Sequence, residues 1–254
     1  MRALHTAATG MQAQQARLDN IANNLANVST TGFKATRATF EDLLYQNYSV
    51  AGADGARRPS QIQLGAGSRI DATVRDMRTG SLEQTGNMLD VAISGRGFIV
   101  VEDTDGTQRY TRDGQLGVNA EGDLVSSSGQ LVSPGIQVPE DATSIEIDAD
   151  GEVSALYADS RVMSLGRIEV VDFINAGGLR AVGGNLYEAT PESGEPMVVE
   201  DGQVGLQQGQ IESSNVDVAI ELVAMIEAQR AYELTSKAIQ AADDSMGIIA
   251  GLKP

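Results

Sequence analysis

The sequence predicts an α+β fold, with N- and C-terminal helices that pair as a coiled coil and a mostly antiparallel, β-rich region between them. Apolar residues recur every seven positions at both ends of the 254-residue chain, whereas the middle alternates short strand-like runs with turn dipeptides. Charge follows the same division, because residues 113–215 contain 18 acids and only three arginines. A nearly uncharged N-terminal end and an acidic middle are expected if the ends are buried among copies of the chain and the middle faces solvent.

The first helix is predicted to end near Asn27, because Ser, Thr and Gly interrupt the periodic pattern over residues 29–32. Its apolar stripe has leucine or methionine at every seventh position. The other faces carry Gln and Asn instead of Lys and Glu. This favours a helix surrounded by other helices over an ordinary amphipathic helix on a globular core.

The second helix is predicted over residues 215–249 and has the same seven-residue spacing. Ser214, followed by Asp217 just ahead of the apolar run, has the arrangement of a capping box. Such narrow stripes stabilise an isolated helix little, so we expect the two helices to pair and to be weakly ordered in a free monomer. The predicted subunit-interface residues along both stripes are Leu4, Met11, Leu18, Leu25, Val218, Leu222, Met225, Tyr232, Ile239 and Met246.

Between the helices, runs such as VAISGRGFIVV, SIEID and RIEVVDF are typical of strands. Turn dipeptides separate them at intervals of about eight residues and predict a meander of short hairpins. These dipeptides are Asp105-Gly106, Asp113-Gly114, Glu121-Gly122, Ser128-Gly129 and, further along, Asp150-Gly151. Residues 46–67 are rich in Gly, Ala and Ser and predict a long loop or extended excursion.

These patterns predict three domains. The first is a terminal helical domain from residues 1–30 and 214–254. The second is a connecting region from residues 31–80 and about 190–213, with a long extension at 45–67. The third is an outer β domain from residues 81–190.

Catalytic groups are scarce in this sequence. His5 is the only histidine, there is no cysteine, and no G-x-S-x-G motif occurs, which argues against nucleophilic triads. Gly95-Arg96-Gly97 begins like a dinucleotide-binding motif, but Val100 stands at the third glycine. We expect no enzyme activity and no cofactor. Paired carboxylates remain open, because their separation is spatial.

Metal, nucleic-acid and membrane partners are also disfavoured. Residues 103–106 and 148–151 resemble the start of calcium loops but lack the twelve-residue frame, so hairpin turns are the better interpretation. A net charge of −17 argues against nucleic acid. No apolar run is long enough to span a membrane, and the first 15 residues lack the core of a cleaved secretory signal. We therefore expect a protein that stays inside the cell or leaves it without such a signal.

Three blocks of the sequence resemble the bacterial flagellar rod and hook proteins, and among them most strongly the distal rod members. The blocks are NIANNLANVSTTGFK followed by FEDLLYQ, then LDVAISGRGFIVV with YTRDGQL, then VDVAIELVAMIEAQRAYELTSKAIQ. Together they extend over almost the whole chain. The motif residues carried over from the family are Asn23, Asn24, Leu25, Ala26, Asn27, Gly32 and Phe33.

The resemblance implies a structural subunit of the basal-body rod in the periplasm, exported by the flagellar type III apparatus. It implies that the terminal helices line a central export channel and that copies polymerise into a straight helical tube that transmits torque. The implied partners are further copies, proximal rod proteins, the hook and hook-junction region, and the surrounding ring proteins. It also makes residues 47–64 a candidate stiffness element.

Three other interpretations remain open at this point. A proximal rod or hook subunit would share the terminal motifs. A secreted peptidoglycan hydrolase would need a carboxyl group of raised pKa, and the sequence nominates none. A cytoplasmic binding module is disfavoured by the uncharged N-terminal face.

Overall fold

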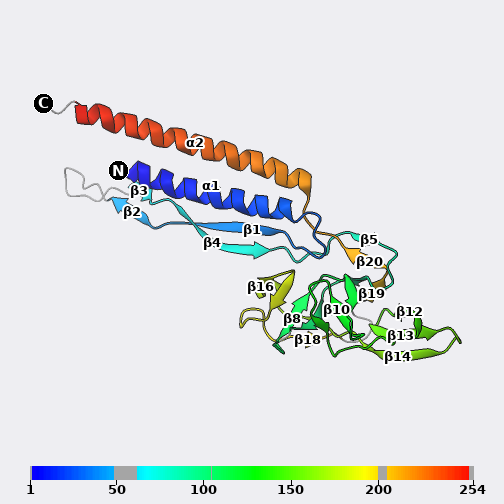
Figure 1. The fold of residues 1–254 in the computed structure, drawn as a ribbon. Coiled ribbons are helices and arrows are strands. Elements are labelled where there is room, and N and C mark those ends of the chain that lie inside the picture. Colours follow the sequence, from blue (N-terminus) through cyan, green and yellow to red (C-terminus); the bar gives the residue numbers. More distant parts are fainter. Residues whose placement is uncertain (1, 49–61, 104, 200–204, 252–254) are drawn as a thin grey trace. The chain divides into compact units, whose positions relative to one another are not determined.

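The structure is a computed structural model that describes residues 2–48, 62–103, 105–199 and 205–251 (Figure 1). It consists of two compact units. The first takes Met1–Ala26, Thr36–Val74 and Asp217–Pro254, and the second takes Asn27–Ala35 and Arg75–Val216. Terminal helices and an antiparallel β-rich middle are thereby confirmed.

The first unit contains both long helices and two pairs of strands. Its elements are α1 (Arg2–Ala26), β1 (Thr36–Asp42), β2 (Tyr45–Tyr48), β3 (Ile62–Gly65), β4 (Ser68–Arg75) and α2 (Val218–Gly251). Strand β1 pairs with β4, and β2 pairs antiparallel with β3. The predicted loop over residues 46–67 thus has a strand pair at its two ends, while residues 49–61 lie outside the described part of the chain.

The helix ends follow from local hydrogen bonds. Helix α1 ends at Ala26, one residue before the predicted end. Helix α2 begins at Val218, and Asp217 caps it, because its Oδ1 accepts from the N–H groups of Ala219 (2.9 Å) and Ile220 (3.2 Å). Ser214 instead accepts from the N–H of Val216. The predicted capping box was therefore misplaced by three residues.

The second unit is built from short strands. They are β5 (Leu82–Gln84), β6 (Val91–Ser94), β7 (Phe98–Glu102), β8 (Gln108–Thr111), β9 (Leu116–Val118), β10 (Leu124–Ser126), β11 (Leu131–Val132), β12 (Ala142–Ile147), β13 (Glu152–Tyr157), β14 (Val162–Arg167), β15 (Val170–Asp172), β16 (Arg180–Gly183), β17 (Leu186–Glu188), β18 (Met197–Val198), β19 (Gly205–Gln208) and β20 (Gln210–Glu212). A 3₁₀ turn, η1 (Ala176–Gly178), lies between β15 and β16.

The main sheet of this unit runs in the order β16-β17-β8-β7-β11-β10-β9, with β15 joining β7 to β18. A separate sheet has the order β12-β13-β14, and β19-β6 and β20-β5 form two-stranded pairs. The last two pairs join segments more than 100 residues apart, so β19 and β20 return the chain to the strands with which the unit began.

Four of the five turn dipeptides connect paired strands as predicted: those at 105–106, 121–122, 128–129 and 150–151. Asp113-Gly114 does not, because β8 and β9 do not pair with each other. Gly114 instead lies against the backbone of Val91, and a Cβ on Gly114 would be 1.5 Å from the Val91 carbonyl oxygen. This dipeptide marks a close approach of two backbones and not a hairpin.

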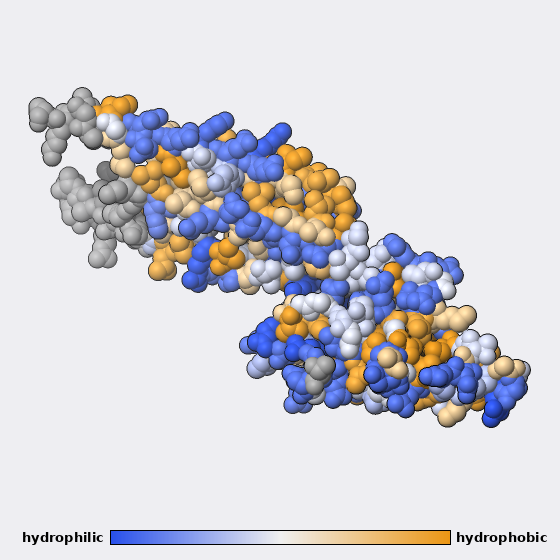
Figure 2. All heavy atoms as spheres, viewed as in Figure 1, coloured by the Kyte–Doolittle hydropathy of each residue, from blue (hydrophilic) through white to orange (hydrophobic). Residues whose placement is uncertain are grey.

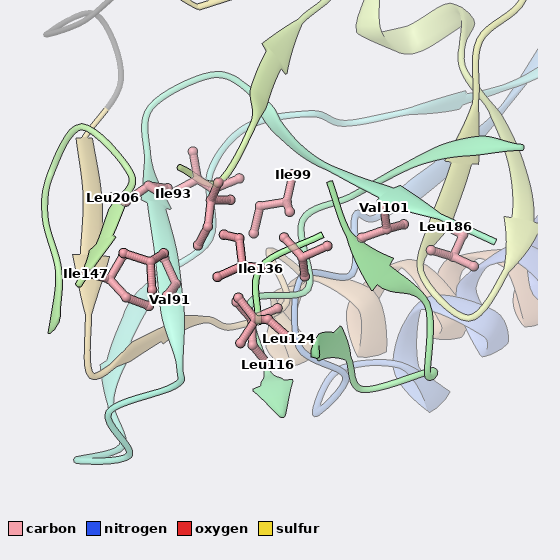
Figure 3. Close-up of a cluster of buried hydrophobic side chains, with 13 residues drawn as sticks. Val91, Ile93, Ile99, Val101, Leu116, Leu124, Ile136, Ile147, Leu186 and Leu206 are labelled. Atoms are coloured by element: carbon pink, nitrogen blue, oxygen red, sulfur yellow. The ribbon is translucent and has the colours of Figure 1, made fainter. Parts of the chain in front are cut away.

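Two apolar clusters fill the second unit. The larger gathers branched side chains from β6, β7, β10 and β13 together with Ile136 and Ile168 (Figure 3). The smaller is aromatic, with Phe173 meeting Phe98 and Tyr110 edge to face at centroid distances of 5.8 and 4.8 Å. Both clusters share β7, whose successive side chains point to opposite faces of the sheet.

Candidate functional site

The predicted interface residues lie on α1 and α2, which run side by side and antiparallel (Figure 1). Near one end of the pair, Asn24 Nδ2 donates to Glu221 Oε1 at 2.9 Å. Fourteen residues earlier on α1, a Cβ on Gly10 would lie 3.9 Å from the Thr235 methyl group. Residue numbers thus rise along α1 as they fall along α2, and these two contacts are fourteen residues apart on both helices.

The structure divides the ten predicted interface residues into two groups. Val218 and Leu222 are exposed, with 40% and 44% of their surface accessible. The other eight are half-buried: Leu4, Met11, Leu18, Leu25, Met225, Tyr232, Ile239 and Met246. Two buried alanines, Ala13 and Ala228, lie between them in the sequence.

The first turns of α2 expose several large apolar side chains that the seven-residue pattern did not select. Ile220, Val223 and Ile226 are 67%, 58% and 51% exposed. Figure 2 shows apolar side chains gathered over this end of α2. The signal was present in the sequence, because VAIELVAMI carries apolar residues on every side of a helix, a pattern typical of a helix that is buried all round.

A groove of about 700 Å³ lies beside the later turns of α2. Leu64 and Leu234 are its large apolar members and are 48% and 67% exposed. The remaining lining residues are small or carry no long side chain. The groove is lined by Thr6, Ala7 and Gly10 of α1, Leu64 and Gly65 of β3, and Leu234, Thr235 and Ala238 of α2.

Asn24, from the family motif, is buried and uses both ends of its amide. Its Oδ1 accepts from the Thr36 N–H at 2.9 Å, and its Nδ2 donates to the Thr36 carbonyl oxygen at 2.8 Å as well as to Glu221. One side chain thereby joins α1, the start of β1 and α2. Such a fully bonded amide tolerates few replacements, because any change leaves a buried polar group unpaired.

The other motif residues take different positions. Asn23 and Ala26 are exposed on α1, and Leu25, Asn27 and Phe33 are half-buried. Gly32 is buried with φ +68°, and a Cβ there would lie 2.8 Å from the carbonyl carbon and oxygen of Arg112. Only glycine suits this backbone conformation and this close approach.

Three charged side chains, which we call the buried triad, meet in the second unit. They are Lys34, Arg112 and Glu212, and each side chain is at most 2% exposed. Glu212 Oε1 accepts from Lys34 Nζ and from the Gly80 N–H, while Oε2 accepts from Arg112 Nε at 2.8 Å. One carboxylate therefore neutralises one of two buried cations, and the triad carries a formal charge of +1.

Backbone carbonyls accept further hydrogen bonds from the two cations of the triad. Lys34 Nζ donates to the Arg78 carbonyl at 2.7 Å, and Arg112 Nη2 donates to the Gly95 carbonyl at 2.8 Å. Burial lowers the pKa of Lys34 below its ordinary value of 10.5, and the nearby Arg112 lowers it further, whereas Glu212 opposes both effects. Sequence reasoning missed the triad, because its members are far apart in the chain and only folding brings them together.

Asn215 reinforces the same place in the second unit. Its Oδ1 accepts from the Ala35 N–H at 2.7 Å, and its Nδ2 donates to the carbonyls of Asp76 (2.9 Å) and Arg78 (3.0 Å). The Asp76 N–H also donates to the Ala35 carbonyl at 2.8 Å. Hydrogen bonds thus tie together three segments, around residues 35, 76 and 215. Each segment lies at an end of one of the two stretches of chain that form the second unit.

The described residues offer little for catalysis. Burial raises the pKa of Asp113, yet its Oδ1 accepts from the Gln115 N–H and its Oδ2 from Ser127 Oγ at 2.6 Å. This carboxyl group is held within the fold. His5 is exposed on α1. Among the described residues, no group of three or more His, Asp or Glu side chains is placed to hold a metal ion.

Among the helices as described, neither combines the length and the hydropathy needed to cross a membrane.

Comparison with protein families matches three parts of the chain. Residues 4–34 match the model described as "Flagella basal body rod protein". Residues 92–155 match "Flagellar hook protein FlgE/F/G D1 domain", and residues 207–252 match "Flagellar basal body rod FlgEFG protein C-terminal". The first and last matches contain α1 with the Asn24 motif and α2, and the middle match lies in the β-rich unit.

Curated relatives match over the whole length. The chain is 47% identical to the flagellar basal-body rod protein FlgG of Borreliella burgdorferi, over 100% of this chain and 99% of the relative. It is 44% identical to FlgG of Agrobacterium fabrum, over 98% of both, and 38% identical to FlgG of Bacillus subtilis, over 100% and 99%. A hook-basal body complex protein of B. subtilis, FlhP, is 27% identical over 98% of both chains.

Proposed function

This chain belongs to the family of flagellar basal-body rod proteins, and from that premise we propose that copies of it polymerise through their terminal helices into the straight distal part of the rod. Its place is the rod of the flagellar basal body. The full-length similarity to proteins named FlgG supports a rod subunit over a hook subunit. A proximal rod or hook position is the alternative that tube geometry tests.

The exposed apolar surface of α2 carries this proposal. Ile220, Leu222, Val223 and Ile226 are each between 44% and 67% exposed. Fully burying such a side chain contributes about 1.5–3 kcal/mol, so burying the exposed remainder contributes about 1 kcal/mol each. The four together contribute roughly 4 kcal/mol, which is at the low end of the cost of association. A stable assembly therefore needs several neighbours per subunit, as in a polymer and not in a dimer.

Within such a polymer, the helices of one chain pair as a coiled coil and line a central channel for export. The side-by-side course of α1 and α2 supports the pairing, as does the seven-residue spacing of apolar residues on both helices. The tube transmits torque through the periplasm. Its neighbours are proximal rod proteins, the hook and hook-junction region, the surrounding ring proteins and, before assembly, the type III export apparatus.

The subunit acts without catalysis. Its family is a structural component of the flagellum, and the carboxyl group with the clearest raised pKa, Asp113, is bonded inside the fold. The peptidoglycan hydrolase alternative would instead require an accessible acid. Substitution of Asp113 is therefore expected to change stability and not any reaction rate.

The test is electron microscopy of purified chain under conditions that promote polymerisation. We expect straight tubes from the native chain and none from Ile220→Asp/Val223→Asp, with helix content by circular dichroism unchanged. Gln240→Asp is the matched control, since Gln240 is exposed on the same helix and polar. Curved tubes would favour a hook-like subunit, and tubes from the double variant would contradict the proposal.

A further inference from the structure

Two features on different sides of α2 have complementary shapes. Val218, Leu222 and Ile226, which we call the ridge, follow one another at intervals of four residues and are 40–51% exposed. Rows at this spacing form the ridges that fit into grooves on neighbouring helices. The groove lined by α1, β3 and α2 offers mainly small side chains, which leave room for branched ones.

The ridge and the groove project in nearly opposite directions. Leu222 and Ala238 are sixteen residues apart, and so are Val218 and Leu234, which corresponds to about four and a half helical turns. Two copies related by a two-fold axis therefore cannot each place the ridge in the groove of the other. A contact between opposite sides of identical subunits is heterologous, and it continues from copy to copy without closing into a dimer.

Formal charge favours the same pairing. Residues 217–228, which carry the ridge, contain three acids and no base, whereas residues 1–18, which supply the α1 wall of the groove, contain two arginines and no acid. Arg17 and Glu227 already pair within a copy at 3.5 Å, and the difference in sign remains when both are set aside. Opposite charge guides such surfaces toward each other and disfavours contact between like surfaces.

We propose that the ridge of one copy docks into the groove of the next, with an axial offset of about 20 Å set by the twelve to sixteen residues between them. The occupant of the groove is thus a second copy of this chain. This inference rests on the proposed polymerisation and deepens it, because it assigns the residues and the direction of one contact between subunits.

Cysteine cross-linking tests the contact directly, since the native chain contains no cysteine. Leu222→Cys and Ala238→Cys chains with tags of different length are mixed, polymerised and oxidised. We expect covalent dimers that contain one chain of each kind, and none from either variant alone. Gln240→Cys is the matched control, because Gln240 is two residues from Ala238 and projects from the ridge side of the helix.

The outcomes separate this contact from polymerisation itself. Tubes without the mixed dimer in both this pair and a second pair, Ile226→Cys with Ala7→Cys, would overturn the ridge-and-groove contact and leave the proposed function standing. Dimers of Leu222→Cys with itself, or equal yields with Gln240→Cys, would also overturn it. Failure of the native chain to polymerise would refute the proposed function, and this inference with it.

Discussion

Glu212→Gln should destabilise the second unit more than Lys34→Met, although both substitutions break the same ion pair. In the native triad one carboxylate faces two buried cations. Glu212→Gln leaves Lys34 and Arg112 buried without the carboxylate that bonds to both of them. Lys34→Met leaves the Arg112–Glu212 pair, whose atoms are 2.8 Å apart, and fills most of the lysine's volume with an apolar side chain.

The magnitudes follow from this charge balance. Removing one partner of a buried pair costs about 3–5 kcal/mol, because it leaves an uncompensated charge, and Glu212→Gln belongs to that class. Lys34→Met loses hydrogen bonds to Glu212 and to the Arg78 carbonyl and should cost about 1–2 kcal/mol. The double variant should cost less than the sum of the two, since Lys34 is no longer present to be left unpaired.

Urea unfolding followed by near-ultraviolet circular dichroism measures these costs. Tyr110 and Tyr187 are buried in the second unit and supply its signal. Glu188→Gln is the matched control, because the exposed Arg180–Glu188 pair should contribute no more than about 1 kcal/mol. If Lys34→Met cost as much free energy of unfolding as Glu212→Gln, the proposed charge balance in the triad would be refuted.

Three further predictions concern single positions and the charge pattern. Burial raises the pKa of Asp113, so the stabilising contribution of this carboxyl group is present below pH 3.8 and is lost as pH rises through the raised pKa. The melting temperature of Asp113→Asn relative to the native protein should therefore be higher at pH 7 than at pH 3. The opposite trend would contradict the assignment. Gly32→Ala should lower the free energy of unfolding by more than Gly129→Ala, which costs about 1 kcal/mol, because both glycines have positive φ but only Gly32 is close to other atoms; equal losses in urea titrations would exclude a role for that contact. Neutralising about eight exposed acids within residues 113–215 should reduce motility in soft agar without blocking rod assembly, because the acidic surface limits adhesion to neighbouring proteins; normal swimming would refute this.

The helices were predictable because their signal is local. Seven-residue periodicity located α1 and α2 to within a few residues, and the turn dipeptides located most hairpins. The capping residue was missed, because Ser214 and Asp217 are both good caps and only the start of the helix decides between them. Likewise, Asp113-Gly114 has the composition of a hairpin turn, but glycine is needed there because a side chain would collide with the backbone of Val91.

Long-range pairing was not predictable in the same way. Strand β20 pairs with β5, and Lys34 meets Glu212 across 178 residues of sequence. No single-chain pattern marks such partners, since each looks like an ordinary strand or surface charge by itself. The exposed apolar residues of α2 are an intermediate case. The composition of this segment indicates apolar residues on every side of the helix, but the seven-residue pattern did not select them.

The pairing of α1 with α2 also determines the order in which the chain can fold during synthesis. Asn24 and its partner Glu221 are 197 residues apart, and translation adds about 5–20 residues per second, so α1 leaves the ribosome roughly 10–40 s before its partner. By the end of that time nearly all of the β-rich unit has been synthesised, whereas the helical unit still lacks α2. The two ends of the chain thus form the last part of the fold. A chain that is truncated before α2 lacks the helix pair even when every strand is present.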